Sequence, residues 1–458
     1  MNLTNRLQKT TLNIFIVTIV VCTFISILLK VNILNIVGIL FVGVLFCVYI
    51  FRDEERLIYF TIILALLSTF ISQYVSIFAN ISEVLIILLI IRILYNVIFF
   101  KRKLKFDKII TILVIITLVL NTVSYIIFLN FKGGIILYIW AVLKRYAFFV
   151  VYIYVINIKS QKRVINNLNN TFKIFIIIQL FITIFQFKMG VNYDNVTGLF
   201  GLYSSGDYAQ FLFIIFAIYI CNKNNKKSNK IFEIFLFMVI IIYAIIAEVK
   251  LIFFVLPLII ILNSLLDRKV KNILYIVLMI IGLVFSISIY SKIYKNKTEF
   301  NETFINEYLT GSYGDIELNR FNFMKQLKEK VFFEDNQLYI GYGIGAANPS
   351  AKTKVLQGPI YVLNKDMKID WFTLPYLIVE SGFIGCILYL SIYLYIFIIS
   401  LYKCFKMKNN TLTIISVLTI ISIIYSSSMI LSTRMIIFTW FYISIFLKYS
   451  KTNNIILK

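Results

Sequence analysis

The chain contains no histidine, and its five cysteines form no CxxC pair. The missing histidine removes the commonest metal ligand and the commonest general base. The cysteines lie in apolar runs or at their ends, so neither a disulfide framework nor a zinc site is indicated. We expect a protein without metal or cofactor. The cysteines are Cys22, Cys47, Cys221, Cys386 and Cys404.

Charged residues are also scarce. They make up 14% of the 458 residues, against 60% hydrophobic residues, and the mean hydropathy is +0.91. Soluble domains contain about 45–50% apolar and about 25% charged residues. A soluble core of this length could not bury so much apolar side chain, so the composition excludes a soluble globular protein and indicates a membrane protein.

Acidic residues are the rarer charge, with 21 Asp and Glu against 45 Lys and Arg and a formal net charge of +24. The basic residues lie in short connectors between apolar runs, as the positive-inside rule requires, and not on one soluble face. We therefore exclude nucleic-acid binding. The first apolar run, Leu12 to Leu29, follows Arg6 and Lys9 but is too long for a signal peptide and has no cleavage site, so we interpret it as a span.

The apolar runs predict an all-α polytopic helix bundle with about fourteen transmembrane helices, each near the length needed to cross a bilayer. Spans 1–11 occupy residues 1–290, and spans 12–14 occupy residues 372–458. The expected spans are 12–29, 33–51, 57–79, 81–99, 109–131, 134–157, 171–188, 206–221, 231–247, 249–266, 273–290, 372–402, 411–431 and 435–448.

The basic connectors alternate along the chain, which predicts that both termini are cytoplasmic. The intervening short connectors carry one lysine or none. The large segment 291–371, between spans 11 and 12, is then extracytoplasmic. The basic connectors contain Arg52 and Arg56; Lys101, Arg102, Lys103, Lys105 and Lys108; Lys159, Lys162 and Arg163; Lys223, Lys226, Lys227 and Lys230; Arg268, Lys269 and Lys271; Lys403, Lys406 and Lys408.

This segment holds two features. Apolar residues recur at helical spacing and predict an amphipathic helix that Asp315 could cap, and a glycine-punctuated turn follows it. The turn has the spacing Gly-x-Gly-x-Gly, which lets the backbone bend and approach a ligand closely. It is not a phosphate-binding P-loop, because no Lys-Ser/Thr pair follows it. The helix positions are Leu318, Phe321, Met324, Leu327 and Val331, and the glycines are Gly341, Gly343 and Gly345.

Several charges fall inside or at the ends of the spans, where each costs about 2.5–3.5 kcal/mol. Snorkelling or pairing would account for Glu83 and Arg92. It accounts less well for Lys144 and Arg145, because adjacent residues point about 100° apart on a helix. These two lie with Lys250, Arg320 and Arg434 toward the outer side. A cluster of outward cations suits a pyrophosphate, since guanidinium groups match phosphate oxygens.

Three stretches resemble the O-antigen polymerase and ligase superfamily (Wzy-type). Glu248-Val-Lys250 is similar to its Ser-Arg or Thr-Lys element. Arg320 followed by the glycine turn is similar to its arginine before a Gly-x-Gly turn. Asp370-Trp-Phe-Thr-Leu and then Glu380-Ser-Gly-Phe-Ile-Gly resemble its polar residues entering the span after the long loop. The resemblance covers roughly residues 190–400.

The resemblance implies a metal-independent glycosyltransferase that polymerises undecaprenyl-pyrophosphate-linked oligosaccharides at the outer face of a bacterial cytoplasmic membrane. Arg320, Asp370 and Glu380 would be catalytic, with a carboxylate assisting the acceptor hydroxyl. The expected partners are this lipid-linked oligosaccharide, membrane lipid, a chain-length regulator and a flippase. The substrate-binding residues would be Lys250, Lys144, Arg145, Arg434, Gly341, Gly343 and Gly345.

Two departures from the family bear on function. The ligases carry a histidine near the position of Asp370, which favours polymerisation over ligation here. The family's arginine before the span near Gly206 is missing from Thr197-Gly-Leu-Phe-Gly201. A lipid-linked oligosaccharide flippase, a glycan ligase and a membrane protein without chemistry stay open as alternatives, although flippases typically have short loops and related halves.

Overall fold

The computed structural model describes residues 48–129, 134–221, 227–267, 322–350, 353–407, 410–426 and 428–449, with isolated positions at 277, 282, 284, 288 and 318. Throughout these residues the regular structure is helical, which confirms the all-α prediction. The described part therefore contains the glycine turn, Asp370 and Glu380. Several predicted features lie outside it: Asp315, Arg320, Phe321, the span 12–29 and nearly all of the span 33–51. The predicted span 273–290 has only isolated positions within it.

The apolar runs that the structure describes all lie on helices. The long spans are joined by short helical turns: η1 (Ser76–Asn80), η2, a π-helical turn (Tyr125–Leu129), η3 (Tyr193–Asn195) and η4 (Gly198–Phe200). The main helices are α3 (Glu54–Tyr74), α4 (Ile81–Phe100), α5 (Lys108–Ser124), α6 (Ile135–Arg145), α7 (Ala147–Asn157), α8 (Gln161–Lys188), α9 (Ser205–Ile220), α10 (Lys227–Ile246), α11 (Leu251–Asp267), α17 (Thr373–Met407), α18 (Thr411–Tyr425), α19 (Ser428–Leu431) and α20 (Thr433–Tyr449).

Five of the described helices are long and apolar enough to cross a membrane, or six if α6 and α7 form one bent span. Three shorter apolar helices accompany them. The protein is thus a multi-pass helical membrane protein by length and composition, while the count of about fourteen spans stays a prediction. The five are Glu54–Tyr74, Phe78–Phe100, Lys108–Phe128, Gln161–Lys188 and Thr373–Lys406.

Several predicted spans differ from the observed helices. The helix in the span 57–79 ends at Tyr74, and the span 411–431 is divided between α18 and α19. Helix α8 begins at Gln161 and not near residue 171, because Val164, Ile165 and Leu168 are buried on one face of an otherwise polar stretch. Hydropathy alone does not detect such an amphipathic extension. The predicted span 134–157 is divided at Tyr146, where α6 and α7 meet at an angle of 47°.

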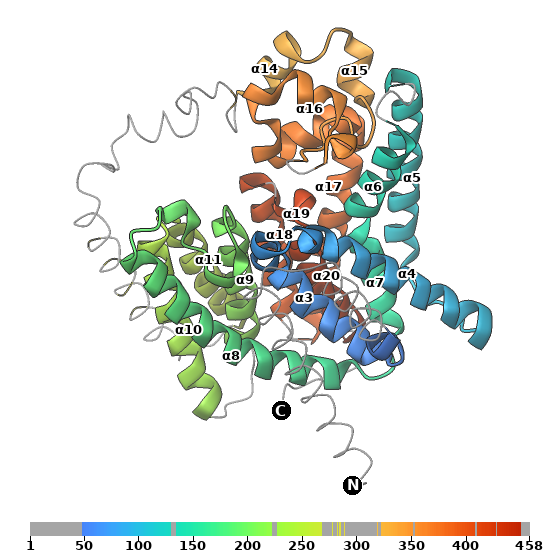
Figure 1. Ribbon diagram of the computed structural model, residues 1–458. Coiled ribbons are helices and arrows are strands. Elements are labelled where there is room, and N and C mark those ends of the chain that lie inside the picture. Colours follow the sequence, from blue (N-terminus) through green and yellow to red (C-terminus); the bar gives the residue numbers. More distant parts are fainter. Residues whose placement is uncertain are drawn as a thin grey trace, which may run out of the picture.

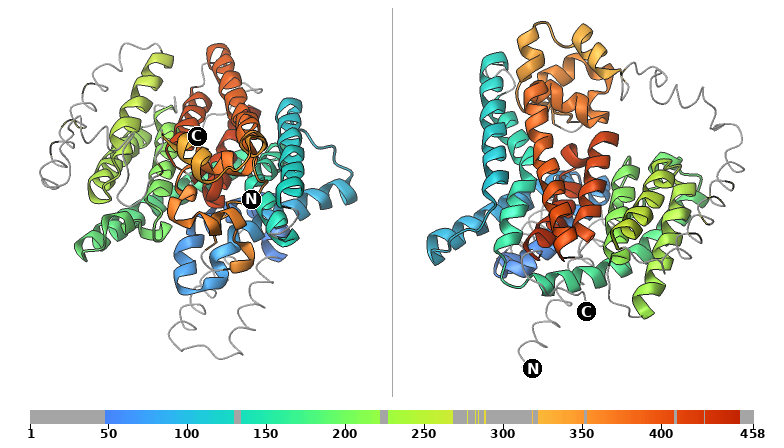
Figure 2. Two further views of the ribbon diagram at one scale, coloured as in Figure 1. Left: turned by 90° about the horizontal axis from the view of Figure 1, so that it is seen from above. Right: turned by 180° about the vertical axis from the view of Figure 1, so that it is seen from behind.

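The helices pack around α20, which contacts α7 and α3 most extensively and also meets α9 and α18. Helix α17 runs along the molecule beside α5 and α18. Helices α9, α10 and α11 form a group to one side, and α8 runs from beneath α3 to this group (Figures 1 and 2). Trp440 of α20 is fully buried in this core. The central position of α20 means that its polar residues must find partners within the protein.

The described part of the segment 291–371 gathers at one end of α17 (Figure 1). It contains α14 (Phe323–Lys330), α15 (Asp335–Ile340), η6 (Lys354–Leu356), α16 (Pro359–Leu363), η7 (Lys365–Met367) and η8 (Ile369–Trp371). The predicted amphipathic helix is confirmed from Phe323 onward, with Leu327 and Val331 buried. Its N-cap position is Asn322, although the Asn322 side chain makes no capping hydrogen bond.

Candidate functional site

Two helices are interrupted at the end of the molecule where the segment 291–371 folds. Helix α6 ends at Arg145, and the chain bends at Tyr146 before α7 begins. Helix α17 has a non-helical residue at Gly382, with φ +65° and ψ −177°. An interruption leaves backbone carbonyl groups without their helical partners, which must be supplied from elsewhere when the site is buried.

The glycine turn supplies those partners to α17. The Tyr342 N–H donates to the Val379 carbonyl at 2.9 Å, and the Gly343 N–H donates to the Glu380 carbonyl at 2.8 Å. Both carbonyls would otherwise bond to N–H groups beyond the break. The turn is therefore a structural complement of the broken helix.

Glycine is required at two of the turn's positions. Gly341 has φ +73°, and a Cβ there would collide with the backbone of Glu380 and Gly382. Gly343 has φ +96°, and a Cβ there would collide with the backbone of Tyr125. Both positions thus combine a left-handed conformation with close backbone approach, which only glycine tolerates well.

Arg145 and Glu380 lie at the two interruptions and form a buried ion pair. The Arg145 Nη2 donates to the Glu380 Oε2 at 2.5 Å, and the side chains are 3% and 0% exposed. The other carboxylate oxygen, Oε1, accepts from the Ala347 N–H at 3.2 Å. The ion pair therefore joins α6, α17 and the residues that follow the glycine turn.

Part of the Arg145 guanidinium is left without a hydrogen bond. It lies over the rings of Tyr376 and Tyr389, at 5.2 Å and 5.7 Å from their centroids. Its Nη1 is buried and has no hydrogen-bond partner among the described residues. A buried guanidinium donor with no acceptor carries a free-energy penalty, so an anionic ligand that reached it would gain a charge-assisted hydrogen bond.

Asp370 lies in η8, just before α17. Its Oδ1 is buried and has no hydrogen-bond partner among the described residues, and burial raises the pKa of the carboxyl above its ordinary value. The negative charge of Asp370 helps to raise the pKa of the nearby Tyr361. The Tyr361 N–H donates to the Ala346 carbonyl at 3.2 Å. Asp370 thus lies near Tyr361, which is bonded to the residues that follow the glycine turn.

Arg434 belongs to a second buried network. Its Nε donates to Asp207 Oδ2 at 2.7 Å, its Nη1 to the Phe200 carbonyl at 2.5 Å and its Nη2 to Ser204 Oγ at 2.5 Å. Ser432 also donates to Asp207, at 2.6 Å. All three guanidinium nitrogens are occupied, so Arg434 fastens the turn before α9 to the start of α20.

A third acidic residue lies close to this network. The Thr433 hydroxyl donates to Glu83 Oε1 at 2.7 Å, and Glu83 is only 6% exposed. Its Oε2 is buried without a partner among the described residues. Thr433 and Arg434 are adjacent, so the starts of α4, α9 and α20 meet here. The short helix α19, which contacts α6, α17 and α20, lies between the two arginine networks.

The structure thus brings together five of the predicted site residues, namely Arg145, Glu380, Gly341, Gly343 and Gly345, while Asp370 lies near Tyr361 just before α17. Arg434 lies in its own network. Lys250 precedes α11, whose main contacts are with α9, α10 and α18. The side chain of the half-buried Lys144 makes no hydrogen bond or ion pair to the described residues, and Arg320 lies outside them.

Sequence reasoning missed Asp207, Tyr376 and Tyr389. A signal existed for Asp207, because an acidic residue at the start of an apolar span requires a partner. No comparable signal marks the two tyrosines, which are common residues in this chain. Within the described residues, no group of three or more potential metal ligands is found.

Neither a protein-family model nor a curated protein matches the chain. The chemistry of the site is therefore argued from its geometry. It offers a buried cation with a free donor beside the glycine turn and, in the segment just before α17, a carboxylate with a free acceptor.

Proposed function

We propose that this protein polymerises undecaprenyl-pyrophosphate-linked oligosaccharide repeat units by glycosyl transfer at the outer face of a bacterial cytoplasmic membrane. The observation that carries the proposal is the unpartnered Nη1 of the buried Arg145, close to the folded segment that holds Asp370. A cation suits the pyrophosphate, and a carboxylate suits the acceptor hydroxyl. Both reactants would be held at one end of the bundle.

Arg145 and Lys144 would bind the pyrophosphate of the donor. A guanidinium that already spends one nitrogen on Glu380 keeps others for phosphate oxygens. Lys144 adds a second charge at the adjacent position, and Arg320 completes the set expected from the sequence. The lipid tail would lie along the exposed apolar faces of the helices, where it meets the membrane.

The transfer requires one bond to form and one to break. The acceptor hydroxyl oxygen attacks the anomeric carbon of the donor glycan, and its proton passes to the Asp370 carboxylate. The bond between that carbon and the pyrophosphate oxygen breaks, and the electron pair leaves with the lipid pyrophosphate. Arg145 stabilises the charge that develops there.

Glu380 has a different role in this scheme. It is fully buried, and both of its carboxylate oxygens are engaged, by Arg145 and by the Ala347 N–H. A carboxylate in that position is poorly placed to take a proton from a sugar. We assign it as a positioning residue that orients Arg145 and the glycine turn.

The test is the Asp370→Asn substitution in a deletion strain complemented with the gene. We expect long-chain glycan to disappear while the protein stays in the membrane at its normal level. Asp366→Asn is the matched control, because Asp366 is an exposed acidic residue of the same segment. Long-chain glycan that persists in the Asp370→Asn strain would refute the proposed role of Asp370.

One observation favours a second function, the transport of lipid-linked oligosaccharide. Interrupted helices that meet at a charged site are typical of transporters, and α6–α7 and α17 meet in this way at Arg145 and Glu380. The two functions differ in where the deletion strain accumulates single repeat units on lipid. Accumulation on the outer leaflet supports the polymerase, and accumulation on the inner leaflet supports the flippase.

A further inference from the structure

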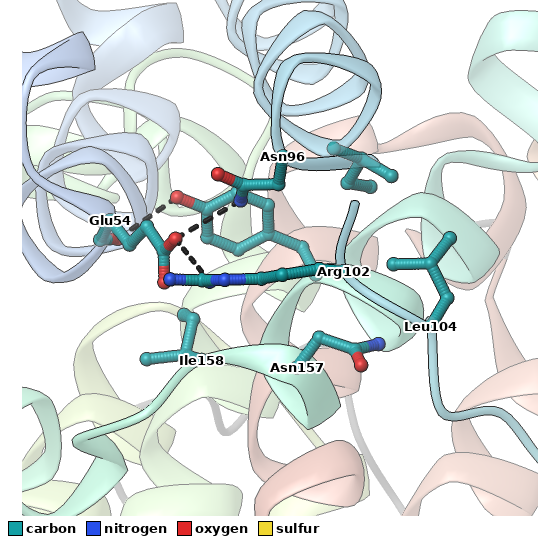
Figure 3. A pocket seen from close by; sticks show the side chains of 8 residues that line it. Glu54, Asn96, Arg102, Leu104, Asn157 and Ile158 are labelled. Carbon is teal, nitrogen blue, oxygen red and sulfur yellow. Dashed lines mark hydrogen bonds and ion pairs between the residues drawn. The ribbon is translucent and has the colours of Figure 1, made fainter. Parts of the chain in front are cut away.

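A small pocket lies at the ends of α4 and α7, away from the arginine networks described above. It is lined by residues that the proposed function does not use. Its wall consists of Glu54 at the start of α3, Asn96 of α4, the connector residues Arg102 and Leu104, and the last turn of α7 (Figure 3). The remaining lining residues are Ile93, Tyr154, Asn157 and Ile158.

The connector 101–107 is fixed in place over this pocket. Asn157 holds Lys105 by both of its backbone groups: the Lys105 N–H donates to Asn157 Oδ1 at 2.8 Å, and Asn157 Nδ2 donates to the Lys105 carbonyl at 2.9 Å. The Asp107 N–H donates to the Tyr152 hydroxyl at 2.8 Å. A connector with several cations is thus held in one conformation, which makes the pocket a built site.

Positive charge dominates around the pocket. Arg102 Nη1 donates to Glu54 Oε1 at 2.6 Å, and Asn96 Nδ2 donates to the same oxygen at 3.0 Å (Figure 3). Lys448 donates to the Ile158 carbonyl at 2.9 Å and lies close enough to Lys105 for their charges to repel. Arg102 and Glu54 are the charged residues that line the pocket, and Lys448 is bonded to the lining residue Ile158, so an anion at the mouth would find cations beside it.

A second observation points to a ligand that also donates a hydrogen bond. Asn96 is 8% exposed, and its Oδ1 is buried without a partner among the described residues. The interior of the pocket has room for about one water molecule. A single hydroxyl group fits that space and would donate to Asn96, while an attached phosphate would stay at the mouth beside Arg102 and Lys105.

Apolar side chains lie exposed beside the mouth. Phe99, Phe100 and Phe106 are 69%, 57% and 50% exposed, and isoleucines of α5 continue this surface. Such a surface accommodates acyl chains in a membrane protein. The pocket therefore combines a phosphate site, a hydroxyl site and a lipid-facing surface.

We propose that this pocket binds the headgroup of an anionic phospholipid with a free hydroxyl, of the phosphatidylglycerol type. The phosphate contacts Arg102 and Lys105, and a headgroup hydroxyl donates to Asn96 Oδ1. Basic pockets between membrane helices at the positively charged face are suited to anionic headgroups. The bound lipid would tie the starts of α3 and α5 to the end of α7.

The experiment is native mass spectrometry of the purified full-length protein with phosphatidylglycerol or phosphatidylcholine. We expect preferential retention of phosphatidylglycerol. Lys105→Ala should weaken that binding by about fivefold, the effect of one cation near a membrane surface. Arg102→Ala should weaken it at least as much. Lys105→Ala keeps the Arg102–Glu54 ion pair, so it tests the site even if Arg102→Ala destabilises the fold.

Lys103→Ala is the matched control, because it removes one charge from the same connector. Both lysines are exposed, but only the Lys105 backbone is bonded to the lining residue Asn157 among the contacts described for the connector. Lys103→Ala should leave the binding nearly unchanged. Equal retention of the two lipids, or an equal loss in Lys103→Ala and Lys105→Ala, would overturn the proposal. Displacement of the lipid by an equal concentration of inorganic phosphate would assign the site to free phosphate and overturn the lipid assignment.

Discussion

Each of the two buried arginines, Arg145 and Arg434, has a carboxylate within 2.7 Å. A buried charge without a counter-charge is costly, and removing one partner of such a pair typically costs about 3–5 kcal/mol. The two arginines differ in whether every guanidinium nitrogen has a hydrogen-bond partner. Arg434 uses every guanidinium nitrogen, whereas Arg145 keeps an unpartnered Nη1. Of these two arginines, Arg145 is therefore the one suited to a ligand.

This difference gives a prediction about stability. Arg145→Gln and Glu380→Gln should each lower the free energy of unfolding by about 3–5 kcal/mol, since each leaves a buried charge unpaired. The double variant leaves no buried charge at this pair of positions and should be more stable than either single variant, yet still inactive. Thermal unfolding in detergent measures the first part. A double variant as unstable as the singles would contradict the role assigned to this pair.

A second prediction concerns pH. Burial raises the pKa of Asp370 above its ordinary value of 3.8, so the folded protein binds this proton more tightly than the unfolded chain does. Stability should therefore fall as the pH rises from the ordinary value through the raised pKa. Activity should rise over the same range, because only the carboxylate accepts a proton.

The measurement is the pH dependence of unfolding and of polymerisation in membranes. Asp370→Asn should abolish the pH dependence of stability in this window, and Asp366→Asn should retain it. An acid limb of the activity profile at the ordinary aspartate pKa would contradict the assignment of Asp370 as the proton acceptor.

At the residue scale, the sequence predicted the important charges because a charge in an apolar span stands out. Arg145 and Arg434 stand out for that reason, whereas Glu380 was proposed through the resemblance of its stretch to the polymerase and ligase superfamily. Their pairing could not be predicted, since Arg145 and Glu380 are far apart in the chain and only the packing of α6 against α17 brings them together. Asp207 was missed although an acidic residue at the start of an apolar span requires a partner, because its position in the first turn of the helix also suits the helix dipole.

At the scale of elements, helices were predicted well where hydropathy is continuous, and their interruptions were not. The apolar run passes through Tyr146 and Gly382 without a change of composition. The break at Gly382 depends on N–H groups supplied by Tyr342 and Gly343, which lie about forty residues earlier. A local pattern carries no information about such a distant partner.

The glycine turn gives a prediction at this scale. Gly341→Ala should destabilise the protein by more than Gly190→Ala, although both glycines have φ +73°. Alanine in that conformation costs about 1–2 kcal/mol at either position. At Gly190 a Cβ meets nothing within 4 Å, whereas at Gly341 it meets the backbone of α17.

The additional cost at Gly341 should be about 1–3 kcal/mol, the usual range for overpacking. The comparison is made by thermal unfolding of the two purified variants in the same detergent. Equal destabilisation would mean that the turn can move away from α17, and the interlocking of turn and broken helix would then be wrong.

At the scale of the whole molecule, the distribution of charge agrees with the arrangement of the helices. The segment with α14, α15 and α16 lies at one end of α17, and the basic connector 101–107 joins the ends of α4 and α5 that lie away from that segment (Figure 1). The sequence predicted this separation because connectors alternate in charge. It could not predict the packing order of the helices, which depends on side-chain shape.

The sidedness itself is the last prediction. In a background without native cysteines, Lys354→Cys should react with a membrane-impermeant thiol reagent on intact cells, and Lys103→Cys should react only after lysis. Both lysines are exposed, so accessibility within the fold is matched. The positive-inside rule places the connector with Lys103 in the cytoplasm. Labelling of Lys103→Cys on intact cells would show that the topology is the reverse of the predicted one. The segment that holds Asp370 would then face the cytoplasm, where undecaprenyl-linked units are made, and not the outer side, where they are joined.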